Sequence, residues 1–272
     1  MGGALAAAAV AAGHEVTISA ATTEHAQAAA ENAGAGARPA ASNAEAVQDA
    51  ELVVLAVPGS AVPVVAAELG EALSGAVVVD STNPLNDTGT DLTTTGRSAA
   101  EELQARLSGA KVVKGFNTIF ASRHASPTEG SVPLDACLAG DDATAKAMAA
   151  ELASSLGYRV IDVGGLRMAR ALEEMAFLNI SLNAANGWPW QSGWKLVGPT
   201  GSERCARRRA GHRQPLPEPR LESAWPPPRE VPAPQGVGRC GLYRWRSPEP
   251  MIPAIGEERP LPAFRGADAS RR

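Results

Sequence analysis

Short apolar runs alternate with amphipathic segments over the first 200 residues. The runs 52–57 and 76–80 are almost wholly apolar and have strand length, which is typical of central strands in a parallel sheet. Weaker runs predict further strands at 16–19, 37–40, 111–116, 136–139 and 158–163. Helical spacing predicts helices at 4–12, 24–32, 44–48 (capped by Asn43), 62–73, 99–107, 143–156 and 168–186. This order predicts an α/β fold, a doubly wound Rossmann-like parallel sheet with a long C-terminal helix.

The pattern stops near Thr200, so we expect one domain over residues 1–200 and a tail over 201–272. The tail holds thirteen of the 21 prolines and a run of three arginines at 207–209, and no period is sustained in it. We therefore expect it to be disordered. Three interpretations stay open: a basic, proline-rich interaction tail, disorder without function, or a reading frame that has slipped out of register.

Composition narrows the class of protein. The 272 residues are 44% hydrophobic, but no run of about 18 apolar residues is uninterrupted, so no membrane span is expected. The start lacks the basic region of a signal peptide, and we expect a cytoplasmic protein. Three scattered cysteines suit neither a disulfide framework nor a metal cluster. The net charge of −4 speaks against nucleic-acid binding.

The amino-terminal stretch GGALAAAAVAAGHEVTIS reads as helix, turn and strand. Its small residues suit a helix lying close to a sheet, and Gly13 suits the end of that helix. A dinucleotide-binding unit has this order, preceded by a strand that ends in G-x-G-x-x-G. Gly2, beside Gly3, can supply only the last glycine of that pattern, so we expect the preceding strand to be absent and its neighbours to form an open, aggregation-prone edge. The alternative is an ordinary buried helix of any α/β protein.

Ligands of doubly wound sheets bind at the carboxyl ends of the strands. The residues just after predicted strands are therefore the candidate site, although each group also suits an ordinary turn. The candidates from these positions are Ser19, Ala20 and Thr22; Ala56, Val57 and Pro58; Thr82, Asn83 and Pro84; and Phe116 and Asn117.

The residues at these strand ends do not form a known catalytic arrangement. The sequence has no nucleophile elbow with a Ser/His/Asp order, no H-E-x-x-H and no G-x-x-x-x-G-K. We therefore expect no catalytic side chain and no metal. Hydride transfer between two cofactors fits this absence, because the protein then supplies binding and orientation.

Several stretches together resemble the family of NADP oxidoreductases that depend on the deazaflavin coenzyme F420. They are the amino-terminal stretch, ELVVLAVP, VVVDSTNPL, KVVKGFNTIFAS and MAFLNISLNAANGWPWQSGWKLVGPTG. The resemblance runs from residue 2 to about 201. It implies a Rossmann-type enzyme that transfers a hydride between NADP(H) and F420 or a similar flavin-like acceptor.

The resemblance also implies roles for single residues. Gly2 matches the last fingerprint glycine, and Ala56-Val57-Pro58 matches the loop beside the ribose and nicotinamide. Thr82-Asn83-Pro84 and Phe116-Asn117 match the wall of the hydride-transfer cleft, and the long helix would place Asn179 and Asn183 beside the deazaflavin.

The predicted second strand bears on the choice of cofactor. The family often has a basic residue after it for the NADP 2′-phosphate, and here only hydroxyl residues and His25 are near. An NAD enzyme usually has Asp or Glu at this place to bind the ribose diol. Neither follows Ser19, so NADP is the better choice.

A cluster of tryptophans, Trp188, Trp190 and Trp194, follows the last helix. It could stack on a flat cofactor ring, but we favour a structural role as a hydrophobic flap or a contact within a homodimer. A protein that binds NADP(H) without catalysis, as a redox sensor, is the alternative function.

Overall fold

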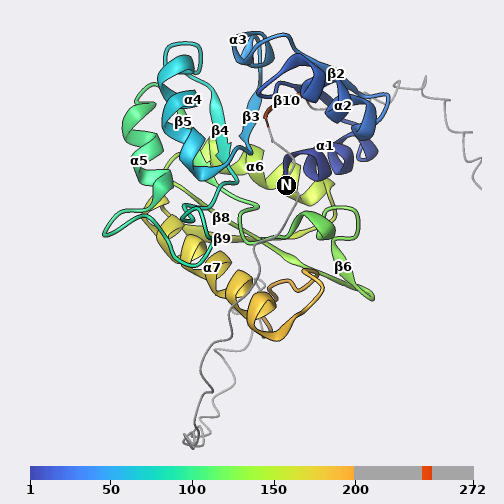
Figure 1. Ribbon diagram of the computed structural model, residues 1–272, viewed down its shortest axis with the longest axis vertical. Coiled ribbons are helices and arrows are strands. Elements are labelled where there is room, and N and C mark those ends of the chain that lie inside the picture. The colour runs from blue at the N-terminus through green and yellow to red at the C-terminus, as the bar shows by residue number, and fades with distance from the viewer. Residues whose placement is uncertain (199–240, 247–272) are drawn as a thin grey trace, which may run out of the picture.

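The computed structural model describes residues 1–198 and 241–246 and shows an α/β fold around one eight-stranded sheet (Figure 1). No helix in these two ranges is long and apolar enough to cross a membrane. The α-helices are α1 Gly2–Ala11, α2 Thr23–Ala33, α3 Asn43–Val47, α4 Val62–Leu69, α5 Ala99–Arg106, α6 Ala143–Ser155 and α7 Ala169–Asn186. The 3₁₀ turns are η1 Gly59–Ala61, η2 Ala121–Arg123 and η3 Leu166–Met168.

The sheet has the order β2-β1-β10-β3-β4-β5-β8-β9. Its strands are β1 Glu15–Ile18, β2 Ala37–Pro39, β3 Leu52–Leu55, β4 Val77–Asp80, β5 Lys111–Lys114, β8 Asp135–Gly140, β9 Arg159–Gly164 and β10 Leu242–Arg246. A separate hairpin pairs β6 Thr128–Glu129 with β7 Val132–Pro133. The β1–β2, β3–β4–β5 and β8–β9 neighbours are parallel. The expected doubly wound sheet is confirmed in this mostly parallel arrangement.

Apolar side chains on both faces of the sheet explain the apolar runs of the central strands. In β3 and β4, Val54 and Val79 join a cluster with α1 and α6, while Val53 and Val78 join a second cluster with α4 and α5. All four side chains are at most 2% exposed. Successive residues of a strand point to opposite faces, so a strand covered on both sides is apolar along most of its length.

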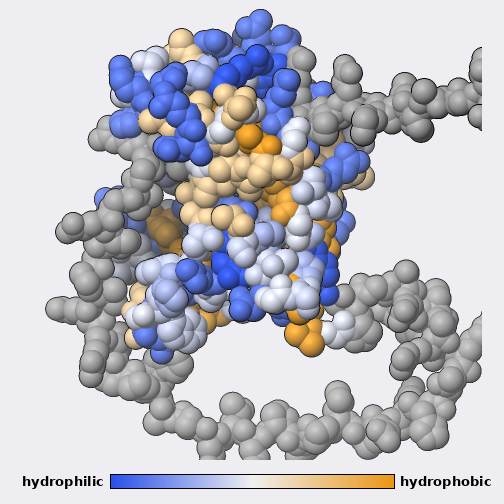
Figure 2. All heavy atoms as spheres, turned by 90° about the vertical axis from the view of Figure 1, so that its right-hand side faces the viewer, coloured by the Kyte–Doolittle hydropathy of each residue, from blue (hydrophilic) through white to orange (hydrophobic). Residues whose placement is uncertain are grey.

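Helix α1 lies close to the sheet because its side chains are small. Leu5, Ala6 and Ala9 are buried in the first cluster, and Tyr243 of β10 belongs to the same cluster. Figure 2 looks at the side of the molecule that carries α1 in Figure 1 and shows a band of apolar residues across its middle. The helix and strand that were expected from the amino-terminal stretch are present, as α1 and β1.

Two expectations about local structure are wrong. Ser42, not Asn43, caps α3, because its side chain accepts a hydrogen bond from the Glu45 amide. Strand β8 runs antiparallel to β5, so the last β-α-β unit is inverted relative to the rest of the sheet. The hairpin of β6 and β7 was not expected.

A third expectation, that the tail has no regular structure, is wrong for β10. This strand pairs antiparallel with both β1 and β3. The edge that we expected to be open between those two strands is therefore filled. Apart from Gly241 and β10, the residues of the expected tail lie outside the described residues.

Candidate functional site

Three loops meet at the carboxyl ends of β3, β4 and β5. A side-chain carbon added to Gly59, after β3, would lie 2.6 Å from the backbone oxygen of Asn83, after β4. The Ser81 hydroxyl donates to the carbonyl of Leu55 at 3.0 Å and fastens the same two loops. Parallel neighbours end at one edge, and here their loops are in direct contact.

Two amides join the loops after β4 and β5. Asn83 Nδ2 donates to the backbone oxygen of Asn117 at 2.9 Å, and Asn117 Nδ2 donates to Asn83 Oδ1 at 3.0 Å. Asn117 Nδ2 also donates to the carbonyl of Leu172 on α7 at 2.9 Å. Asn117 Oδ1 is buried and has no partner among the described residues. The structure therefore brings these two predicted residues together at the edge of the sheet where the parallel strands have their carboxyl ends, which we call the rim. It leaves Asn117 Oδ1 without a partner among the described residues.

The turn just before Asn117 contains an unusual backbone conformation. Phe116 is fully buried and has a φ of 61°, in the left-handed region. Such a conformation costs on the order of 1–3 kcal/mol for a residue other than glycine and is found often at functional sites. Gly115 precedes it, where an added side-chain carbon would lie 2.7 Å from Leu138. Packing at Gly115 and burial of the ring hold this turn in place.

A buried charge cluster beneath the loops was missed by the sequence reasoning. Lys114 Nζ contacts Asp80 Oδ2 at 2.9 Å, Glu173 Oε1 at 3.0 Å and the carbonyl of Thr82 at 2.7 Å. All three charged side chains are at most 1% exposed. Asp80 Oδ1 accepts hydrogen bonds from the Thr82 amide and hydroxyl. The charged residues at the ends of the apolar strands VVVD and KVVK are the sequence signal from which this cluster could have been predicted.

Glu173 extends this cluster to another helix. Its carboxylate accepts hydrogen bonds from the amides of Ala99 and Ala100 at 3.1 and 3.3 Å, at the start of α5. Burial raises the pKa of Glu173, and the Lys114 ammonium opposes that rise. The cluster thus links the strand ends, α5 and α7 directly under Thr82-Asn83-Pro84.

The predicted nucleotide-binding residues lie at the other end of the rim. Ser19 is buried and its hydroxyl donates to Asn43 Oδ1 at 2.8 Å, while Ala20 is half-buried. Thr22 and His25 are exposed, and Thr22 caps α2 by accepting from the His25 amide. Gly2 opens α1 and lies against the Tyr243 ring, while Gly3 faces open space.

The loop after β3 has a graded exposure. Ala56 is buried, Val57 is half-buried and Pro58 is exposed. Pro84, across the contact between the two loops, is buried.

Asn179 and Asn183 contact the loop after α7. Ser192 Oγ donates to Asn179 Oδ1, and Asn183 Nδ2 donates to Ser192 Oγ, both at 2.7 Å. Asn179 is seven residues beyond Leu172, about 10 Å along the helix. The structure does not join these two asparagines to the Asn83–Asn117 pair.

Asp135 fastens the segment that carries the tryptophans. Its carboxylate accepts from Arg159 at 2.6 and 2.7 Å, from Lys195 at 3.0 Å and from the Leu196 amide at 2.6 Å. Burial alone would raise the pKa of Asp135, but these hydrogen bonds hold it below its usual value. Trp190 packs edge-on against Phe120 with ring centres 5.5 Å apart. The segment thus forms a flap clamped to the body.

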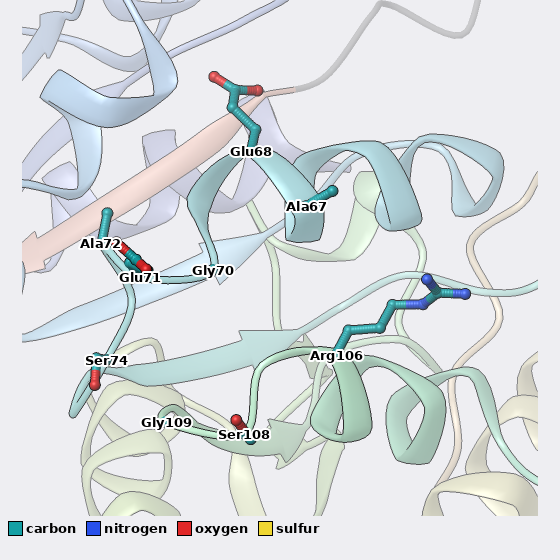
Figure 3. Close-up of a pocket in the computed structure, with 9 residues that line it drawn as sticks. All are labelled: Ala67, Glu68, Gly70, Glu71, Ala72, Ser74, Arg106, Ser108 and Gly109. Atoms are coloured by element: carbon teal, nitrogen blue, oxygen red, sulfur yellow. The ribbon is translucent and has the colours of Figure 1, made fainter.

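A hollow among the described residues lies away from this rim. It measures about 950 Å³ and lies between the ends of α4 and α5, before β4 and β5 begin. Figure 3 shows two of its charged residues, Glu68 and Arg106, pointing in different directions. It lies at the amino ends of the strands and is not the candidate site.

Known proteins resemble this chain in sequence and in fold. Residues 1–84 match the family described as NADP oxidoreductase, coenzyme F420-dependent. An F420-dependent NADP reductase of Methanothermobacter marburgensis is 36% identical over 154 residues, which are 54% of this chain and 68% of that protein. Rat metalloreductase STEAP3 is 34% identical over 106 residues, 39% of this chain and 21% of that protein.

A solved structure supports the same relationship. The crystal structure of a candidate F420-dependent NADP reductase from Arthrobacter sp. FB24 superposes with a TM-score of 0.64 at 32% identity, covering 72% of this chain and 94% of that one. The expected resemblance is confirmed: the chain belongs to the family of F420-dependent NADP oxidoreductases.

Proposed function

We propose that this oxidoreductase transfers a hydride between NADP(H) and coenzyme F420. When both are bound, the hydride with its two electrons passes between the nicotinamide and the deazaflavin, and the solvent supplies or takes up the accompanying proton. The observation that carries the proposal is the interlocked pair Asn83–Asn117 at the strand ends, in a chain of this family.

The residues at the rim fit the nicotinamide end of such a cofactor. The half-buried Asn83 and Val57 and the exposed Pro58 offer a surface of two small apolar groups and one amide. The buried cluster around Lys114 fixes the Thr82 carbonyl, and with it the loop that carries Asn83. These contacts would hold a bound ring in one orientation, which is what hydride transfer requires of the protein. The hydride transfer itself needs no acid or base from a side chain.

The residues after β1 suit NADP better than NAD. Ser19 and Ala20 follow β1, and neither can bind a ribose diol as a carboxylate would. Thr22 and His25 are exposed beside them and can donate hydrogen bonds to a 2′-phosphate. We further propose that residues 1–200 form the oxidoreductase domain, with β10 added to its sheet.

The test is the loss of absorbance of oxidised F420 on addition of NADPH, with a flavin and a ferric chelate as other acceptors. We expect Asn83→Ala to lower the rate by about ten-fold, because a lost hydrogen bond to a polar group costs on the order of 1–3 kcal/mol. Asn86→Ala in the same loop is the matched control and should keep the rate. Equal rates for both variants would contradict this placement of the cleft.

Non-catalytic sensing of NADP(H) remains the second candidate. The contact between Tyr243 and Gly2 favours it. Through this contact, the start of α1, where a dinucleotide would bind, touches β10, a segment that is distant in the chain. NADPH binding without reduction of any of the three acceptors would favour the sensor over the enzyme.

A further inference from the structure

The strand β10 is docked in the middle of the sheet, far along the chain from its neighbours. It pairs over four residues with each of β1 and β3. Its Leu242 and Tyr243 side chains are 1% and 5% exposed and belong to the apolar clusters on opposite faces of the sheet. Segment 241–246 therefore occupies a slot one strand wide.

The direction of β10 brings its beginning to the candidate site. Because it is antiparallel to β1 and β3, its amino end lies at their carboxyl ends. The Ser19 amide donates to the Leu242 carbonyl at 2.9 Å. A side-chain carbon added to Gly241 would collide with the Ser19 carbonyl oxygen. The chain thus crosses the end of β1 in close backbone contact, where a ribose would approach.

The ring of Tyr243 occupies a second part of the same site. A side-chain carbon added to Gly2 would collide with the ring and the hydroxyl oxygen of Tyr243. Gly2 is the first residue of α1, and the amides of a first helical turn are the usual partners of a dinucleotide pyrophosphate. The ring and a pyrophosphate would need the same space above Gly2.

We propose that segment 241–246 is an autoinhibitory strand, which competes with the dinucleotide for the rim between α1 and the end of β1. The proposal rests on the proposed function and adds regulation of the same site. The strand completes the sheet through its backbone and Leu242. The obstruction comes from Gly241 and from the ring of Tyr243, which also packs in the first cluster. Displacing these two residues from the rim opens the place for the pyrophosphate and ribose.

The first test measures NADPH binding to the full chain by calorimetry. Tyr243→Ala should lower the dissociation constant by roughly ten-fold, within the range typical of coupling between two binding events. Tyr243→Phe keeps the ring, and Arg244→Ala changes the opposite face of the strand, so both should bind as the unchanged chain does. An unchanged or higher dissociation constant for a folded Tyr243→Ala overturns the proposal.

The second test needs no substitution. Hydrogen exchange of the amides of residues 242–246 is followed with and without saturating NADP⁺. Competition predicts faster exchange when NADP⁺ is bound, whereas a strand that only supports the site would exchange at the same rate or more slowly. Either of the latter results overturns the proposal.

The two experiments separate this proposal from the function on which it rests. Binding of NADPH with equal affinity by the unchanged chain and Tyr243→Ala, with β10 still protected, overturns the autoinhibition alone. Absence of binding at millimolar NADPH in both forms overturns the proposed function as well.

Discussion

The burial of His124 can be tested through the pH dependence of the free energy of unfolding. Its side chain is 2% exposed and lies between Tyr158, whose hydroxyl is 2.9 Å from Nδ1, and Met1, whose sulfur is 3.0 Å from Nε2. Burial, together with the smaller effect of the nearby amino-terminal charge, lowers the pKa of His124 from 6.5 to about 3. Between pH 6.5 and about 3 the imidazole is therefore neutral in the folded protein, whereas an unfolded chain would protonate it.

The sign and size of the effect follow from proton linkage. Between pH 6.5 and 3 the unfolded state binds a proton at this group and the folded state does not. The contribution of His124 to the free energy of unfolding is complete above pH 6.5 and is lost as the pH falls toward 3. Between pH 7 and pH 5 the loss amounts to about 2 kcal/mol.

The measurement is urea unfolding at pH 7, 6 and 5 for the unchanged chain and for His124→Gln. Glutamine can still bond to the Tyr158 hydroxyl but does not titrate, so its free energy of unfolding should fall by about 2 kcal/mol less over this range. All other titrating groups are common to both proteins and cancel in the comparison. Parallel pH profiles for the two proteins would refute the burial of a neutral His124.

Two further substitutions test the charge cluster and the flap. Lys114→Met should destabilise the fold by roughly 3–5 kcal/mol in denaturant unfolding, because it leaves two buried carboxylates without a cation. Adding Glu173→Gln should recover part of this loss of stability. No recovery would contradict the pairing of Lys114 with Glu173. Asp135→Asn should speed tryptic cleavage at Lys195, because it removes the carboxylate that clamps the flap. The difference in cleavage rate between the variant and the unchanged chain should shrink as the pH falls toward the lowered pKa of Asp135. Cleavage at the same rate at pH 7 would speak against the clamp.

The helices and the central strands could be predicted because their signals are local. Buried runs such as Leu52–Leu55 and the cap at Ser98 depend on neighbouring residues alone. The antiparallel entry of β8 could not be predicted, since side-chain period does not encode the direction in which two strands pair. β10 was missed for a related reason: a five-residue strand surrounded by prolines gives little periodic signal, and its stability comes from β1 and β3.

The site was predictable as a set of loops but not as a bonded network. Strand ends indicated Asn83 and Asn117, because ligands of such sheets bind there. That the two amides bond to each other depends on the spacing of β4 and β5 in space. The role of Glu173 depends on how α7 crosses α5, which a single helix pattern does not contain.

The contact of Glu173 with the start of α5 has a consequence for the order of folding. Ser98 and Glu101 satisfy each other's donors in the first turn, but the amides of Ala99 and Ala100 bond to a carboxylate that lies 73 residues or more away in the chain. Until α7 docks, that turn therefore lacks two of its partners. We expect α5 and α7 to open and close as one cooperative unit, so that these two amides exchange hydrogen only when the last helix leaves the body.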